Sequence, residues 1–145
     1  MAFRGQHEHS LDSTDRLTVP RKFRAALDDG YVLAKGPDAC LWRYATSEFD
    51  AMEDRYVAPH SPFGANARDL RRMLNASADE GELDAAGRSR IPELLKSAAG
   101  LEGACTVVGT GQYIEVWNTE AWAKKNAELL GQCAEVAENL AGGEE

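Results

Sequence analysis

The sequence predicts a mainly β protein with short helices (α+β), built from two tandem copies of one small unit. Residues 11–20 read LDSTDRLTVP and residues 83–92 read LDAAGRSRIP, so Leu, Asp, Arg and Pro recur at identical spacing. In the flanks, Phe23 and Leu95 keep the same separation of 72 residues. Internal repetition of this kind sets the architecture, because each copy stands for one structural unit.

The first copy alternates between turn-forming and β-favouring residues. Four turn formers follow one another at 12–15, and the pattern of residues 17–19 suits a returning strand. Pro20 fits the start of a helix, and Gly30 can end that helix in the left-handed conformation. We therefore expect a strand, a turn, a strand, a helix, two strands and a helix at residues 7–11, 12–15, 17–19, 21–28, 31–35, 40–44 and 47–55.

The second copy repeats this order after a connecting segment. Residues 57–66 contain two prolines and a glycine and should form a loop, and residues 67–75 should form a helix. Thr110 and Gly111 are expected to turn a hairpin near the end of the copy. The expected elements are a strand, a turn, a strand, a helix, two strands and a long helix at residues 79–83, 84–87, 88–91, 92–99, 105–109, 112–117 and 120–140.

The domain organisation expected from this pattern is unit one at 7–54, unit two at 80–123, and a C-terminal helix with an acidic tail at 124–145. A unit of about 45 residues buries too little apolar surface to be stable alone. Its open sheet edges also need a partner. Interleaved hairpins from the two copies would satisfy both needs.

The net charge of the chain is −8, but the charges are unevenly distributed. Residues 1–75 hold 11 basic and 11 acidic residues, whereas residues 76–145 hold 5 and 13. The overall acidity argues against DNA binding. A local basic cluster argues for it, because salt screens distant charge beyond about 10 Å. That cluster consists of Arg4, Arg16, Arg21, Lys22 and Arg24.

Other residue patterns exclude several classes of protein. Cys40, Cys105 and Cys133 show neither a disulfide framework nor a Cys-x-x-Cys pair, and Cys40 and Cys105 are expected to be inert buried thiols. We find no apolar run of the roughly 20 residues that a membrane span needs, and no signal peptide. We therefore expect a cytosolic protein. No set of residues converges on a reaction, so an enzyme is not expected.

The repeated Asp-x-x-x-Arg turn allows two interpretations. Arg16 and Arg88 follow the turn at the start of a strand, and Arg suits bidentate contact with guanine or phosphate. Asp12 and Asp84 can accept hydrogen bonds from backbone N–H groups and hold the loop in shape. The residues alone leave open whether the turn contacts DNA or serves only the fold.

Two further patterns favour structural interpretations. His7 and His9 could offer two imidazoles to a metal, but without a third ligand an ordinary exposed strand is preferred. Trp42, Trp117 and Trp122 could stack on bases, but their matching places in strands and a helix favour packing in the core or at a subunit interface.

These residues resemble the MraZ family of bacterial transcriptional regulators, within the AbrB-like (SpoVT-AbrB) swapped-hairpin superfamily. The resemblance covers nearly the whole chain. Besides both repeated strings, it rests on the residues 1–5 MAFRG, 40–42 CLW, 107–109 VVG and 114–117 IEVW, together with Trp122.

The resemblance implies two AbrB-type β-barrel units that form a pseudo-dimer, and subunits that assemble into closed rings. It implies binding to repeated double-stranded DNA elements upstream of the protein's own division and cell-wall operon, repression of that operon, and a place in the cytoplasm at the nucleoid. No cofactor or metal is implied. Its DNA-contacting residues would be Asp12, Arg16, Asp84 and Arg88. Charge alone adds Arg4, Arg21, Lys22 and Arg24.

The turns depart from the usual Asp-x-Lys-Gly-Arg pattern of this family. The first copy has Thr14 for Lys and Asp15 for Gly, and the second has Ala86 for Lys. Asp tolerates positive φ better than most residues, so the turn can survive. A second carboxylate beside Arg16 is expected to weaken phosphate binding. The alternative function is a ring-forming scaffold without DNA binding, using the acidic second copy and the C-terminal helix.

Overall fold

The fold is known from a computed structural model, which describes residues 2–143. The elements follow the expected order with small shifts at their ends. They are β1 (Gln6–Ser10), β2 (Arg16–Thr18), α1 (Arg21–Arg24), η1 (Ala25–Leu27), β3 (Tyr31–Lys35), β4 (Leu41–Ala45), α2 (Thr46–Tyr56), α3 (Ala65–Asn75), β5 (Asp79–Gly81), β6 (Arg88–Arg90), α4 (Glu93–Ala98), β7 (Ala104–Gly109), β8 (Ile114–Asn118) and α5 (Thr119–Ala141). The single helix expected at 21–28 is instead one α-helical turn followed by the 3₁₀ turn η1.

The two copies share their sheets. A six-stranded antiparallel sheet has the order β1-β7-β8-β4-β3-β5, and a separate two-stranded sheet pairs β2 with β6. Strand β1 of the first copy therefore pairs with β7 of the second, and β5 of the second pairs with β3 of the first. This confirms the α+β class, the two tandem copies and the interleaving of their hairpins. No barrel closes around either copy alone among residues 2–143.

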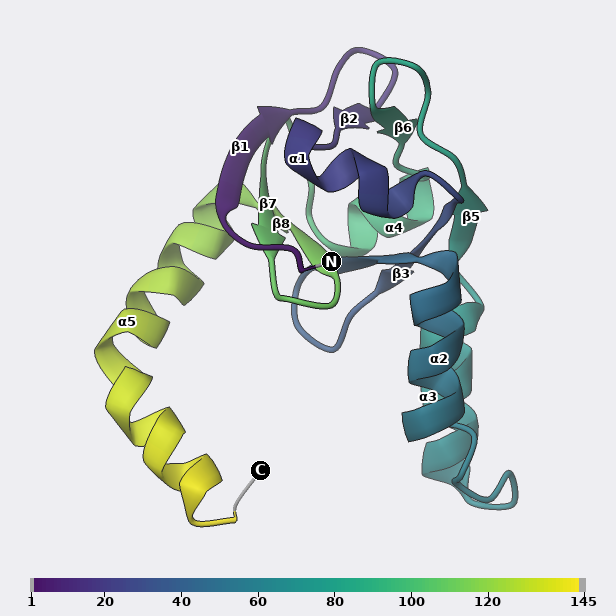
Figure 1. The fold of residues 1–145 in the computed structure, drawn as a ribbon, viewed down its shortest axis with the longest axis vertical. Coiled ribbons are helices and arrows are strands. Elements are labelled where there is room, and N and C mark those ends of the chain that lie inside the picture. Colours follow the sequence, from purple (N-terminus) through teal and green to yellow (C-terminus); the bar gives the residue numbers. More distant parts are fainter. Residues whose placement is uncertain (1, 144–145) are drawn as a thin grey trace.

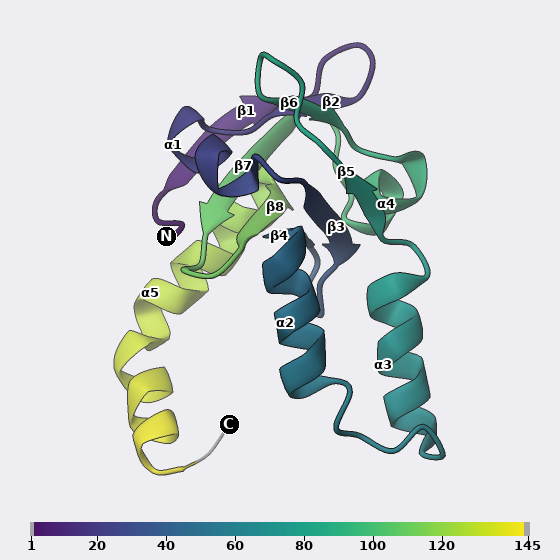
Figure 2. The ribbon, with the colours of Figure 1, turned by 45° about the vertical axis from the view of Figure 1, so that its right-hand side comes forward.

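The main core lies between the six-stranded sheet and a cover made of the β2/β6 sheet, α1, η1 and α4 (Figures 1 and 2). Leu17, Val19 and Phe23 of the first copy pack there with Ile91 and Leu95 of the second. Val19 matches Ile91 and Phe23 matches Leu95 at the repeat spacing, so both copies contribute equivalent residues to one shared core.

The opposite face of the six-stranded sheet carries the longer helices. Helices α2 and α3 pack on β3 and β4 around Tyr44, Phe49 and Leu74. The first turns of α5 pack on β7 and β8, with Trp122 against Trp117. From there α5 extends away from the sheet on one side, and α2 and α3 extend on the other (Figure 1). The packing interpretation of the tryptophans is therefore confirmed.

A buried carboxylate on this face is satisfied by two tryptophan side chains. Glu115 lies in the sheet and accepts hydrogen bonds from the indole N–H of Trp117 at 2.9 Å and of Trp42 at 3.3 Å.

Cys40 and Cys105 are buried, as expected, and burial raises the pKa of the Cys105 thiol to about 11. At neutral pH both thiols stay protonated and unreactive.

The histidine strand differs from its expectation. His7 and His9 are half-buried rather than exposed, because β1 turns them toward the core. The His7 ring packs edge-on against Phe23, with ring centroids 5.5 Å apart. Within residues 2–143 no cluster of three metal-ligating side chains occurs. None of the helices described is long and apolar enough to cross a membrane.

Candidate nucleic-acid interface

The repeated turns form two loops that lie side by side at one end of the molecule (Figures 1 and 2). In loop 1, residues 12–15, Asp12 Oδ1 accepts hydrogen bonds from the backbone N–H of Thr14 at 2.8 Å and of Arg16 at 2.9 Å. In loop 2, residues 84–87, Asp84 Oδ1 accepts the equivalent bonds from Ala86 and Arg88, both at 2.9 Å. The aspartates thus hold the loop shape, as the sequence suggests.

These N–H groups also change the acidity of the two carboxyls. The backbone hydrogen bond from Arg16 lowers the pKa of Asp12, and that from Arg88 lowers the pKa of Asp84. A carboxylate that accepts such bonds is stabilised in its charged form. Both aspartates are therefore anionic at neutral pH, and part of their charge is compensated by the loop backbone.

Each loop contains one residue in the left-handed conformation. Gly87 has φ 76° in loop 2, and Asp15 has φ 59° at the equivalent position of loop 1. Asp15 is the only non-glycine residue with positive φ among residues 2–143. The turn therefore survives the replacement of glycine, as expected from the tolerance of Asp for this region.

The other copy holds each loop in place. The Val19 N–H donates to Gly87 O, and the Ile91 N–H donates to Asp15 O, both at 2.8 Å. Lys96 of the second copy reaches the Asp15 carboxylate, with Nζ 3.1 Å from Oδ1. The negative charge of Asp15, which was expected to weaken phosphate binding beside Arg16, is therefore paired with the positive charge of Lys96.

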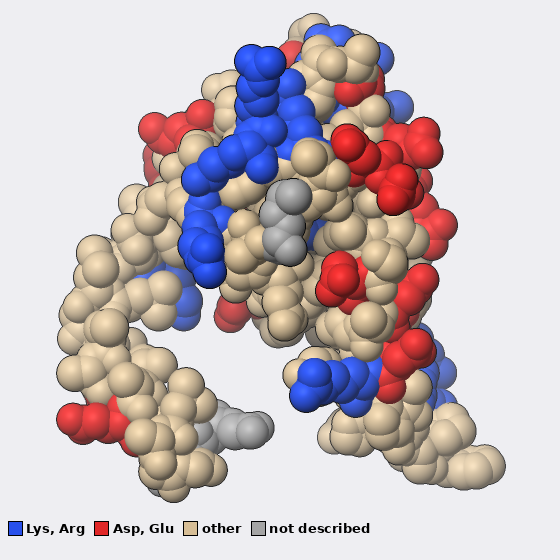
Figure 3. Space-filling model, viewed as in Figure 1, with Lys and Arg blue, Asp and Glu red and all other residues tan. Residues whose placement is uncertain are grey.

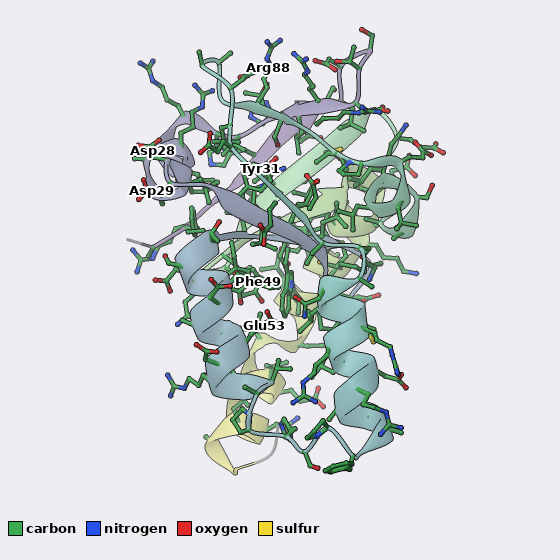
Figure 4. All side chains as sticks on the ribbon, turned by 90° about the vertical axis from the view of Figure 1, so that its right-hand side faces the viewer. Asp28, Asp29, Tyr31, Phe49, Glu53 and Arg88 are labelled. Carbon is green, nitrogen blue, oxygen red and sulfur yellow. The ribbon has the colours of Figure 1, made fainter. Side chains whose placement is uncertain are left out.

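The two loops are joined to a short ribbon formed by β2 and β6. In this ribbon Arg16 pairs with Arg90, Leu17 with Ser89, and Thr18 with Arg88. Leu17 and Ser89 are buried, so their neighbours along each strand face outward. The outward face of the ribbon thus carries three arginines and one threonine. Figure 4 shows Arg88 at this end, on the other side of the sheet from Phe49 and Glu53.

The remaining basic residues predicted from charge lie on and around α1. Arg4, Arg21 and Lys22 are exposed, and Figure 3 shows a band of Lys and Arg side chains over α1. Arg24 is different. It is half-buried, and its Nε donates to Val19 O at 2.9 Å. Arg24 therefore braces the base of the loops, whereas the other three point into solvent.

Two residues of this end were missed by the sequence reasoning. Arg90 lies directly opposite Arg16, and the alternation in Arg88-Ser89-Arg90 was the signal that both arginines share a face. Arg43 is fully buried, and its Nη2 donates to the Ser89 hydroxyl at 2.6 Å. Burial lowers the pKa of the Arg43 guanidinium to about 10. No sequence pattern predicted a buried arginine in β4.

Comparison with known proteins places this geometry in a family. The family model described as "MraZ protein, putative antitoxin-like" matches residues 2–73 and again residues 74–141. The chain is 35% identical to the transcriptional regulator MraZ of Heliobacterium modesticaldum and 35% identical to that of Syntrophomonas wolfei. It is 37% identical to that of Alkaliphilus metalliredigens. Each of the three comparisons covers 95% of this chain and 96% of the relative.

These names describe regulators of transcription, which are not a class of enzyme. The two successive matches of one family model also agree with the two interleaved copies of the fold. On this evidence the chain belongs to the MraZ family of transcriptional regulators.

Proposed function

We propose that this protein binds double-stranded DNA through its recognition end, defined here as the β2/β6 ribbon with loops 1 and 2. The observation that carries the proposal is the outward face of the ribbon, with Arg16, Arg88 and Arg90 in one small antiparallel sheet. The major groove of B-DNA admits a two-stranded β-ribbon, and Arg is the commonest side chain in contact with guanine there.

Local charge makes this binding compatible with an acidic protein. Asp15 is paired with Lys96, and Asp12 and Asp84 are occupied by backbone N–H groups. Arg4, Arg21 and Lys22 remain exposed beside the ribbon. In the proposed complex they meet phosphates, which position the protein, while the ribbon arginines reach the groove.

The surface of α5 supports a homo-oligomer. No residue of α5 is buried, although it has 23 residues. Leu129, Val136 and Leu140 are exposed on it at successive intervals of seven and four residues, which places them on one face of the helix as an apolar stripe. Exposed apolar stripes of this kind mark protein contacts. We propose that α5 packs on a neighbouring subunit, and that repeated contacts of this type close a ring.

A ring would present many recognition ends to repeated DNA elements. Linked sites raise the overall affinity without new contacts, provided that the geometry allows simultaneous binding. We propose that the DNA elements are repeats upstream of the protein's own division and cell-wall operon, that binding represses this operon, and that the protein is held at the nucleoid. The names of the matched relatives support a role in transcription.

The proposal is tested by fluorescence anisotropy of upstream DNA fragments at two salt concentrations. The Arg16→Ala variant should bind at least about fivefold more weakly than the wild type. Arg55→Ala is the matched control, because Arg55 is also exposed but lies on α2, beyond the far face of the sheet. Its affinity should equal that of the wild type.

Oligomeric state is measured by light scattering in the same samples. A Leu129→Glu, Val136→Glu double variant should yield smaller particles and weaker DNA binding, because it places charge in the apolar stripe of α5. A wild-type ring that leaves all upstream DNA unbound at low salt would overturn the proposal and favour the scaffold function.

A further inference from the structure

The two ends of the β2/β6 ribbon are related by the internal repeat but do not carry the same residues. Position 16 corresponds to position 88, and position 18 corresponds to position 90, at the spacing of 72 residues. The register pairs Arg16 with Arg90 at one end and Thr18 with Arg88 at the other. The first end therefore presents two arginines on its outward face, and the second presents one.

The second difference concerns what each loop arginine contacts. Arg88 Nε donates to Asp84 Oδ2 at 3.1 Å, which ties its guanidinium back to its own loop. For Arg16, no side-chain hydrogen bond or ion pair occurs within residues 2–143. Loop 1 uses a hydroxyl instead, since Thr14 Oγ1 donates to Asp12 Oδ1 at 2.9 Å.

The repulsion between Arg16 and Arg90, which face each other across the ribbon, destabilises the protein when no anion is bound. Directly opposed residues on one face of an antiparallel pair have Cβ atoms about 4.5–5.5 Å apart, and like charges there destabilise the pair. Neither Arg16 nor Arg90 has an acidic partner among residues 2–143. An anion between the two guanidinium groups removes this repulsion, and each group offers five N–H donors to its oxygens.

We infer that Arg16 and Arg90 together make the strongest contact of this protein with duplex DNA. Arg88 contributes less, because its guanidinium is hydrogen-bonded to Asp84. The inference rests on the proposed function and deepens it. The paired guanidinium groups suit closely spaced acceptor oxygens, which duplex DNA offers both on neighbouring phosphates and on the edge of guanine. The two copies of the Asp-x-x-x-Arg turn are thus unequal in function.

The decisive comparison uses the full-length protein with Arg90→Thr and Arg88→Ala. The Arg90→Thr variant gives the first end the Thr-opposite-Arg pairing that Thr18 already forms at the second end, so it should fold normally. We expect its affinity for upstream DNA to fall at least about fivefold. We expect Arg88→Ala to weaken binding by a smaller factor than Arg90→Thr, because the Arg88 Nε already donates a hydrogen bond to Asp84 Oδ2.

Binding to an upstream duplex and to a scrambled duplex distinguishes contact with phosphate oxygens from contact with base edges. If Arg90→Thr weakens binding equally on upstream and scrambled duplexes, and reduces the salt dependence of binding, the pair grips phosphates. If the loss is confined to upstream DNA, the pair reads base edges. Both results support the inference.

A second readout needs no DNA. Added salt should raise the melting temperature of the wild type more than that of Arg90→Thr, because salt screens the repulsion that only the wild type contains. If the wild type binds upstream DNA while Arg90→Thr binds equally well, or while Arg88→Ala is the weaker variant, the inference is wrong and the proposed function stands. If the wild type does not bind at all, the proposed function itself fails.

Discussion

The guanidinium of Arg24 lies directly over the backbone of Gly87, so that a Cβ placed on Gly87 would overlap its Nε and Cζ atoms. Arg24 belongs to the first copy and Gly87 to the second. The equivalent relationship links Lys96 of the second copy to Asp15 of the first, 3.1 Å apart. Each loop of the recognition end is therefore contacted by the helix that follows the other loop, so the two copies stabilise each other's loops.

Gly87→Ala should be strongly destabilising. An L residue with φ near 76° costs about 1 kcal/mol, and the overlap with Arg24 adds about 1–3 kcal/mol of overpacking. Gly100→Ala is the matched control, because Gly100 has φ 61° but open space around its Cα. Urea unfolding should show Gly87→Ala as the less stable variant. Equal losses of stability would mean that Arg24 does not pack on Gly87.

Neutralising Asp15 and Lys96 one at a time should separate their effect on stability from their effect on DNA binding. The Lys96 and Asp15 side chains are 26% and 32% exposed, so loss of this solvent-screened ion pair should change stability little in either variant. Asp15→Asn removes a negative charge beside Arg16 and should tighten DNA binding at low salt. Lys96→Gln leaves the Asp15 carboxylate unpaired and should weaken it. Shifts of the same sign in the two DNA titrations would contradict this account.

Acid should destabilise the loops through Asp12 and Asp84. Their backbone hydrogen bonds lower both folded-state pKa values below the ordinary 3.8, so the unfolded chain takes up protons first as the pH falls. The stabilisation is fully present above that ordinary value and is lost as the pH falls through the lower folded values.

This dependence can be followed by urea unfolding between about pH 6 and pH 2, the range in which such carboxylates titrate. Asp12→Asn and Asp84→Asn keep a side-chain acceptor for the loop N–H groups but cannot titrate. Each variant should therefore lose less stability over this range than the wild type. If the wild-type profile is no steeper than those of the two variants, these carboxyls are not coupled to folding.

Arg43 should be more costly to the fold than an apolar residue of similar size. It is fully buried between the sheet and the ribbon, Ser89 is the acceptor of its single side-chain hydrogen bond, and its Nε and Nη1 have no partner among residues 2–143. Its guanidinium carbon lies 4.5 Å from the centre of the Tyr31 ring. Replacing a buried charge with a packed apolar side chain is often neutral or stabilising by about 1–4 kcal/mol.

We therefore expect Arg43→Met to unfold at the same or higher urea concentration than the wild type. Ser89→Ala should lower stability by about 1–3 kcal/mol, because it removes the hydrogen-bond acceptor and leaves the charge buried. Combining the two substitutions should recover most of that loss. A double variant that is less stable than Ser89→Ala alone would disprove this coupling.

The order of elements could be predicted from the sequence because its signals are local. The turn formers at 12–15, Pro20 and Gly30 each act on their own stretch of backbone, and the structure places β1, β2 and α1 accordingly. The split of the 21–28 helix into α1 and η1 was not predicted, since the choice between α-helical and 3₁₀ hydrogen bonds in such a short helix depends on how it packs against the core.

The candidate site was only partly predictable. Asp12 and Asp84 hold their loops as the repeated string suggests, because their hydrogen bonds span two to four residues. The role of Arg24 as a brace was not predicted, since its side chain packs on Gly87 of the other copy in addition to its bond with Val19 O. The half-burial of His7 also depends on a distant partner, Phe23 of α1.

By itself, the sequence determined that one unit occurs twice, that each copy carries an Asp-x-x-x-Arg turn, and that alternate residues of each following strand share a face. Only the tertiary structure decided that β2 pairs with β6, which brings Arg90 opposite Arg16 and puts Arg43 beneath Ser89. The physical reason is that strand pairing is set by contacts across more than 70 residues of chain. The register that minimises buried polar groups and fills the shared core is a property of both copies together.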